Sequence, residues 1–190
     1  MRFARLIPLV GSVLAFGCGD GGAMTAPSTP ATLNIMLKDA PFADAKAVFV
    51  TFADASVRAS NGDFIRLPFA NNMSGRTCDL KQLVSSQDLL SSGTLTTGHY
   101  TQVRLVVASA TLFFDNAAGG PPCGAVLPMP QGRNASASVV SGEVRLNQEF
   151  DVTSTTATTI VVDFDGGRSL SVTGSGAYSL SPVLSVVSVN

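Results

Sequence analysis

Apolar and polar residues alternate along several short stretches of this chain. The stretch T-L-N-I-M-L-K at residues 32–38 has an apolar side chain at every second position, which predicts a β-strand with one buried face. Pro41 lacks the N–H that a sheet requires, so the strand should end at Asp39-Ala40-Pro41. We expect a turn there, in which the Asp39 side chain accepts hydrogen bonds from nearby backbone.

Similar patterns recur to the end of the chain. Strands are predicted at 46–58, 64–69, 99–107, 110–114, 126–129, 139–146, 150–152, 158–164, 169–172 and 178–189. Asn-Gly-Asp at 61–63 and Gly-Gly at 166–167 indicate turns between them. Residues 70–97 are less regular, and we expect a short strand and one helical turn there, the turn beginning at 86–88.

No long segment has a helical period. Short strands separated by turn signals at regular spacing predict an all-β fold, a single β-sandwich of the immunoglobulin or transthyretin kind with about seven or eight strands. The residues expected in its core include Ile35, Phe49, Leu105, Val107, Val162 and Phe164.

The beginning of the chain predicts where the protein works. An apolar run at 6–16 follows two arginines and ends just before Cys18, which is the pattern of a secretory signal with a lipobox-like cleavage site. We therefore expect residues 1–17 to be a signal peptide. Residues 18–31 would then be a lipidated, palmitate-carrying Cys18 and a flexible tether, and residues 32–190 would form the β-sandwich domain.

This segment has two other possible interpretations. A transmembrane anchor is disfavoured, because the apolar run is about half the ~20 residues that a spanning helix needs. A plain secretory signal followed by an unmodified cysteine stays open, because Ala15 stands where lipoboxes usually carry leucine.

Composition limits the kinds of ligand. Lys and Arg number 12 and Asp and Glu number 13, for a formal net charge of −1, so nothing points to nucleic acid. The chain has no Trp and only 2 Tyr, and aromatic platforms for sugars or bases are scarce. Its 11 Phe are expected in the core.

With Cys18 lipidated, Cys78 and Cys123 remain as a pair. An exported chain favours a disulfide between them. Closing a loop of about 45 residues would stabilise the fold by about 4 kcal/mol in the chain-entropy model. Two separate buried thiols are the alternative.

Four motifs in sequence order resemble a known family: I-M-L-K-D-A-P at 35–41, G-H-Y-T-Q-V-R-L-V at 98–106, V-D-F-D-G-G-R-S at 162–169 and G-S-G-A-Y-S-L-S-P-V at 174–183. They are similar to the successive motifs of an exported bacterial and archaeal family, domain of unknown function 4382. The resemblance covers about residues 32–188 and implies an envelope lipoprotein, with no activity attached.

One of these motifs also resembles a feature of known β-sandwich folds. Gly98 and Tyr100, which enter the strand that carries Arg104, resemble the turn found in transthyretin-like and carboxypeptidase-regulatory β-sandwiches. The chain departs from the family pattern at 70–97 and 115–145, where the Cys pair and a Pro-rich loop lie.

The residues offer little for catalysis. His99 is the only His, so a Ser-His-Asp site would have to use it, and no G-x-S-x-G elbow is present. One His also falls short of the usual zinc ligand set. We expect His99 to be a surface side chain at a strand end.

Asp163 and Asp165 are the candidate metal ligands. Strand alternation places both on one face, with Phe164 on the other. A Ca²⁺ ion needs six to eight oxygens, which two carboxylates do not supply. The favoured interpretation is that both accept hydrogen bonds from backbone or from Arg168 or Arg104. Alternation leaves Arg104 either on the outer face beside Gln102 or inward against a carboxylate.

These features predict a non-enzymatic cell-envelope lipoprotein. It would be a binding or structural module without cofactor, attached to a membrane through its lipid, with an unknown protein or glycan as ligand and loops at one end as the contact surface. Gly19 carries no aspartate-type retention signal, which favours the outer membrane, facing periplasm or exterior. The alternative is a Ca²⁺-dependent carbohydrate-binding module or hydrolase that uses Asp163 and Asp165.

Overall fold

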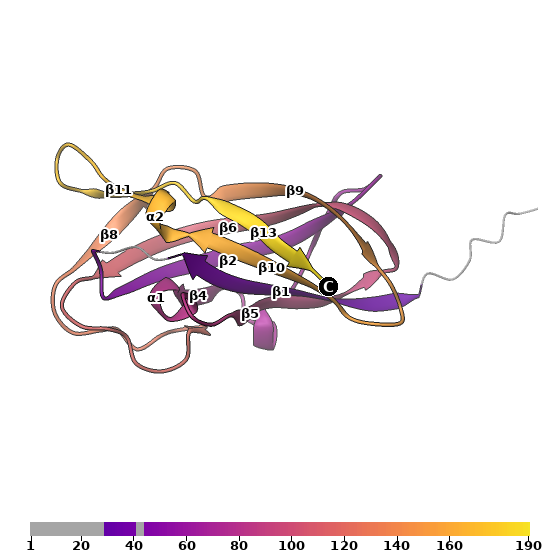
Figure 1. The fold of residues 1–190 in the computed structure, drawn as a ribbon, viewed down its shortest axis with the longest axis horizontal. Helices are drawn as coiled ribbons and strands as arrows, with labels where there is room; N and C mark the ends of the chain where they lie inside the picture. The colour runs from indigo at the N-terminus through magenta and orange to yellow at the C-terminus, as the bar shows by residue number, and fades with distance from the viewer. Residues whose placement is uncertain (1–28, 41–43) are drawn as a thin grey trace, which may run out of the picture.

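The computed structural model describes residues 29–40 and 44–190. Thirteen strands and three short helical turns follow one another along this part of the chain (Figure 1). They are β1 (Pro30–Ala40), β2 (Ala47–Ala59), β3 (Phe64–Arg66), η1 (Ala70–Asn72), β4 (Arg76–Asp79), α1 (Leu80–Leu83), β5 (Asp88–Thr96), β6 (Gly98–Phe113), β7 (Cys123–Gly124), β8 (Asn134–Val139), β9 (Glu143–Val152), β10 (Thr158–Asp165), α2 (Gly166–Ser169), β11 (Leu170–Val172), β12 (Tyr178–Leu180) and β13 (Leu184–Val189).

The strands form two sheets that pack on one another. One sheet has four strands in the order β13-β10-β1-β5, and in Figure 1 it overlies the larger one. The larger sheet has nine strands, with the path β11-β12-β8-β6-β2-β4-β7, while β3 pairs with β2 and β9 pairs with β6. The predicted all-β class is confirmed.

The predicted number of strands was too low. One additional strand, β7, has only two residues and lies where a loop was expected, and the predicted strand at 178–189 is divided into β12 and β13. Conversely, the two strands predicted at 99–107 and 110–114 form one strand, β6. Its 16 residues pair first with β9 and then with β8. No strand forms at 126–129, and the helical turn α1 begins at Leu80, before the predicted position.

The main core lies between the two sheets. Five of the six predicted core residues belong to it, each no more than 3% exposed: Ile35, Leu105, Val107, Val162 and Phe164. The sixth, Phe49, is buried on the opposite face of the large sheet, where its ring lies 4.9 Å from that of Phe113, with Leu127 beside them. A loop after β6 therefore covers part of the outer face with a second, smaller apolar cluster.

A disulfide holds that loop in place. Cys78 in β4 and Cys123 in β7 lie opposite each other in the sheet, with Cα atoms 4.1 Å apart and an S–S bond of 2.06 Å. The predicted pairing is confirmed, and the bridge joins β4 to a strand of only two residues.

One of the two inner strands of the smaller sheet, β1, has partners that are distant in sequence. It runs parallel to β10, with Leu37 opposite Val162 and Asp39 opposite Phe164, and antiparallel to β5. The carboxyl ends of β1 and β10 therefore meet at one end of the molecule.

Several sequence predictions lie outside the described residues: the signal peptide at 1–17, the lipidated Cys18, most of the tether at 18–31 and the strand-ending Pro41. Within the described part of the chain, no helix is long and apolar enough to cross a membrane.

Candidate binding surface

The candidate carboxylates lie as alternation predicts. Asp163 and Asp165 are half-buried on the outer face of β10, and Phe164 between them is fully buried. Asp163 Oδ1 is 3.8 Å from Nζ of Lys38, its partner in register on β1, which is an ion pair too long for a hydrogen bond. Asp165 caps α2 by accepting the backbone N–H of Arg168 at 2.9 Å.

The favoured structural interpretation therefore holds for Asp165, which accepts a backbone hydrogen bond, but not for Asp163, whose Oδ1 has no hydrogen-bond partner in the described structure. Arg168 also places Nε 3.9 Å from Asp165 Oδ2. The other proposed partner, Arg104, was wrong, because it belongs to the opposite sheet and its side chain meets Asp54 instead.

Asp39 is the group whose role the sequence interpretation missed. It is 3% exposed and continues the buried series of Leu33, Ile35 and Leu37. Its Oδ1 accepts the N–H of Gly166, 127 residues away, at 3.1 Å, whereas Oδ2 has no hydrogen-bond partner in the described structure. The expected bond to nearby backbone was wrong for Oδ1, since its donor is Gly166, the first residue of α2 directly after β10.

The surroundings of Asp39 favour its neutral form. Burial raises its pKa to about 8, and the nearby Asp163 and Asp165 carboxylates add to the rise, while the Gly166 hydrogen bond and Lys81 oppose it. Gly166 must also be small, because a Cβ there would lie 3.1 Å from Asp39 Oδ1 and 3.2 Å from the Ala40 carbonyl. We call Asp39, Asp163, Asp165 and Gly166 the acidic corner.

The remaining predicted positions have structural contacts. Gly98 begins β6 with φ of +152°, a conformation that favours glycine. Tyr100 is buried, stacks on Phe150 and donates its hydroxyl to the Thr96 carbonyl at 2.8 Å.

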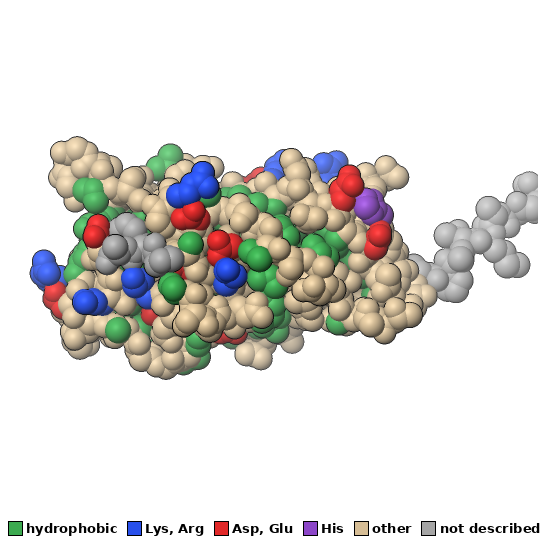
Figure 2. Space-filling model, in the orientation of Figure 1, with side chains coloured by type: hydrophobic (Ala, Val, Ile, Leu, Met, Phe, Trp, Pro, Cys, Tyr) green, Lys and Arg blue, Asp and Glu red, His purple; other side chains and the backbone are tan. Residues whose placement is uncertain are grey.

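His99 lies at the surface with one carboxylate. Its Nδ1 is 2.9 Å from Asp151 Oδ1, and Figure 2 shows the single His beside acidic side chains. The Ser60 hydroxyl donates to the backbone carbonyl of His99 at 3.1 Å rather than to the ring. In the described residues, no group of three or more His, Cys, Asp or Glu is placed to hold a metal ion.

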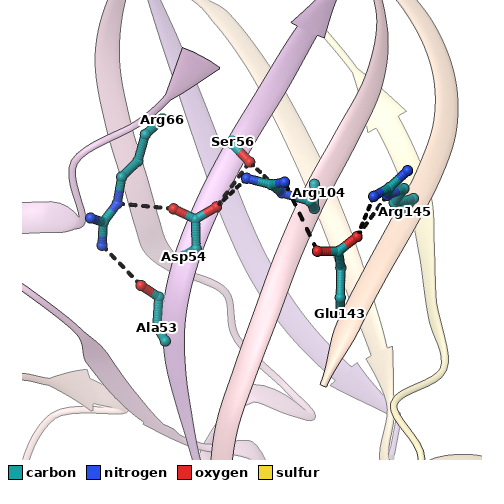
Figure 3. Close-up of polar contacts among 7 residues, drawn as sticks. All are labelled: Ala53, Asp54, Ser56, Arg66, Arg104, Glu143 and Arg145. Atoms are coloured by element: carbon teal, nitrogen blue, oxygen red, sulfur yellow. Dashed lines mark hydrogen bonds and ion pairs between the residues drawn. The ribbon is translucent and has the colours of Figure 1, made fainter. Parts of the chain in front are cut away.

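The densest polar network lies on the outer face of the large sheet. Arg66 on β3, Ser56 on β2, Arg104 on β6 and Arg145 on β9 stand opposite one another in register, strand by strand. Asp54 and Glu143 flank this row, opposite Val106 of β6. We call these six residues, which Figure 3 shows, together with Phe64 the arginine ladder.

Ion pairs link the ladder from edge to edge. Arg104 donates to Asp54 Oδ2 at 3.1 Å and to the Ser56 hydroxyl at 2.9 Å, and its Nη1 is 3.9 Å from Glu143. Asp54 also lies 2.9 Å from Nε of Arg66. Arg145 holds Glu143 with two nitrogens, each at 2.7 Å.

An aromatic ring covers the centre. Arg104 and Arg145 place their guanidinium carbons 4.3 and 5.5 Å from the centre of the Phe64 ring, a cation–π arrangement. Arg104 and Asp54 are 24% and 18% exposed, whereas Arg66 and Arg145 are 60% and 55% exposed. The ladder therefore has a shielded centre and two accessible cationic ends.

The sequence interpretation located only one member of this ladder. It allowed Arg104 on the outer face beside Gln102, which is where it lies. The other members come from three further strands, and no local motif joins them. Arg104 and Arg145 are directly opposite like charges, which is destabilising alone, so the two carboxylates explain why the arrangement is stable.

The fold and the site define the structural class of the protein. It is an all-β protein of two packed sheets with a charged ladder across one outer face. Residues 30–182 match the family described as "Domain of unknown function (DUF4382)", and the chain belongs to that family. Neither the curated proteins nor the solved structures contain a match. The likeness to immunoglobulin or transthyretin sandwiches stays a prediction.

Proposed function

We propose that this protein is a non-enzymatic binding module of the cell envelope, held at a membrane by lipid on Cys18. The lipobox-like segment supports the location, and Gly19 favours the outer membrane with the domain facing periplasm or exterior. Membership of the DUF4382 family is compatible with this role. The tether at 18–31 would let the domain reach ligands near the membrane surface.

The observation that carries the binding role is the arginine ladder. Its side chains are held in place by one another and by rigid strands, so little conformational entropy would be lost when a ligand binds. Its cationic ends are accessible on an open sheet face. We therefore locate the contact on this face rather than at the loops at one end of the sandwich.

The Ca²⁺-dependent alternative has less support. The Lys38 ammonium lies against Asp163, and the Arg168 guanidinium lies near Asp165. Both cations would repel a metal ion at that position, and two carboxylates leave most of the ligand positions of Ca²⁺ unfilled.

The test has two readouts. Cells that express the full chain with a labelled palmitate precursor should yield a labelled protein in the membrane fraction, and Cys18→Ala should release unlabelled protein to the soluble fraction. Binding of the detergent-solubilised protein to immobilised envelope material should fall in an Arg66→Gln/Arg145→Gln variant. Membrane retention without Cys18, or binding unaffected by the double variant, would contradict the proposal.

A further inference from the structure

We propose that the arginine ladder binds an acidic polysaccharide that carries one carboxylate on each sugar, a polyuronate. This inference rests on the proposed binding role and names the ligand of the same surface. It depends on the charge of the ladder, its free hydrogen-bond donors and its spacing.

The charge of the surface has the required sign. Three guanidiniums face two carboxylates in the ladder, and Arg58 in the adjacent row adds a fourth cation, whose Nε donates to the Gly62 carbonyl at 2.9 Å. Asp63, in the turn next to Phe64, is exposed and offsets part of this excess. In the ladder and this adjacent row four arginines still face three carboxylates, although Glu149 and Asp151 are exposed farther along β9, so this part of the face complements an anionic partner.

Donors remain for a ligand. Each guanidinium has five N–H groups. Arg66 uses Nε for Asp54 and one terminal nitrogen for the Ala53 carbonyl, and Arg145 directs two nitrogens at Glu143. The remaining terminal nitrogen of each has no bond within the described residues, and both side chains are more than half exposed.

The spacing fits a repeating ligand. Neighbouring strands lie about 4.8 Å apart, so the row from β3 to β9 presents cations at one- and two-strand intervals perpendicular to the strands. The one-strand interval is close to the length of one hexose in an extended glycan. A polyuronate lying across the strands would therefore place carboxylates one and two sugars apart near these arginines.

A polymer also explains why the ladder keeps its own carboxylates. A single small anion would compete with Asp54 and Glu143 for guanidiniums, and an isolated exposed ion pair contributes at most about 1 kcal/mol. Several linked carboxylates gain from effective concentration once the first has bound. The ladder thus suits weak contacts that repeat along a chain.

Affinity electrophoresis tests the assignment. The full exported chain, solubilised in neutral detergent, would migrate through gels that contain polygalacturonate, its fully methyl-esterified form, or dextran. We expect retardation only by polygalacturonate, decreasing with added salt because exposed ion pairs are screened. Arg66→Gln/Arg145→Gln should lower the affinity by about tenfold or more, as expected for losing one charge-assisted hydrogen bond.

Arg133 supplies the matched control. It is 80% exposed, pairs with Asp115 through two nitrogens and lies 6.0 Å from the Phe114 ring, away from the ladder. Arg133→Gln should bind polygalacturonate like wild type. Equal losses in both variants, equal retardation by the esterified polymer, or stronger binding to phosphatidylglycerol vesicles would overturn the assignment.

The outcomes separate the two proposals. If wild type ignores polygalacturonate while the double variant still loses binding to envelope material, the ligand class is wrong and the binding role stands. If the double variant binds envelope material like wild type, the proposed function itself fails.

Discussion

The arginine ladder and the acidic corner are two charged regions on opposite sheets that treat charge differently. In the ladder every carboxylate lies within 4 Å of a guanidinium, and water reaches the outer members. In the acidic corner Asp39 lies inside the core face, with one backbone donor and one oxygen that has no partner in the described structure. Its nearest ionic neighbours include two further carboxylates.

The difference shows how position decides the protonation state. A guanidinium beside a half-exposed carboxylate favours the charged form. Burial disfavours the charged form of Asp39 more strongly than Lys81 and the Gly166 hydrogen bond favour it, so Asp39 folds more easily with its proton. The ladder should therefore depend on salt, whereas the acidic corner should depend on pH.

The largest effect is expected from Asp39→Asn at alkaline pH. The pKa of Asp39 is near 8 in the folded protein and 3.8 when unfolded, so the native state holds the proton more tightly. Its contribution to stability is complete below pH 4 and declines as pH rises to about 8. Each pH unit in this window costs about 1.4 kcal/mol at most.

Asparagine keeps the acceptor for the Gly166 N–H without ionising. Chemical denaturation between pH 4 and 9 should thus show Asp39→Asn gaining on wild type by several kcal/mol as pH rises. The raised pKa of Asp79 acts in both proteins and cancels in the difference. If the stabilities of wild type and Asp39→Asn changed equally with pH, folding would not raise the pKa of Asp39. The contrast between the two regions would then disappear.

Arg104→Gln should produce the next largest effect. It removes the shielded cation that contacts Asp54, Ser56 and Glu143, and hydrogen bonds to charged groups contribute about 1.5–3 kcal/mol. We expect a fall in melting temperature of several degrees, smaller at high salt. Arg168→Gln, which removes an exposed arginine 3.9 Å from its carboxylate, serves as control and should change stability by less than about 0.5 kcal/mol.

Asp165→Ala should have a moderate effect. It removes the cap of α2 and should cost about 1 kcal/mol, whereas Asp165→Asn should recover most of this because Asn caps equally well. Both variants remove a charge that raises the pKa of Asp39. The decline in stability, which still begins near pH 4, should therefore end at a lower pH and be smaller in both. An unchanged pH profile would mean that the two carboxylates are not coupled.

The smallest expected effect is that of Ca²⁺ on wild type. A ligand that binds only the native state must raise the melting temperature. We expect no rise at millimolar Ca²⁺, because Lys38 and Arg168 lie against the candidate oxygens. A clear rise that Asp165→Asn abolishes would support the metal-dependent alternative and overturn the structural interpretation of the corner.

Local patterns predicted much of this fold and little of its charged surface. The alternation of apolar and polar residues predicted the buried face of β1 correctly. Asp39 continues the same alternation, but its burial was not predicted because a turn was expected at that position. The β-branched run of β10 likewise predicted burial of Val162 and Phe164 correctly. Cys78 and Cys123 could be paired because two half-cystines leave few choices.

The ladder could not be predicted in the same way. Which residue of β9 lies opposite Arg104 depends on register shifts at bulges in β6, such as that between Tyr100 and Gln102. Such shifts depend on packing across the whole sheet and leave no local signal. The parallel pairing of β1 with β10 is equally invisible, and it alone brings Gly166 to Asp39.

That parallel pairing has a consequence for how the chain reaches its native state. Leu33 lies opposite Thr158, and the Gly166-to-Asp39 bond spans 127 residues, so β1, an inner strand of the smaller sheet, acquires this neighbour only after most of the chain is present. Contacts of such high contact order slow folding. We expect the acidic corner to be among the last regions to acquire protection from hydrogen exchange during refolding.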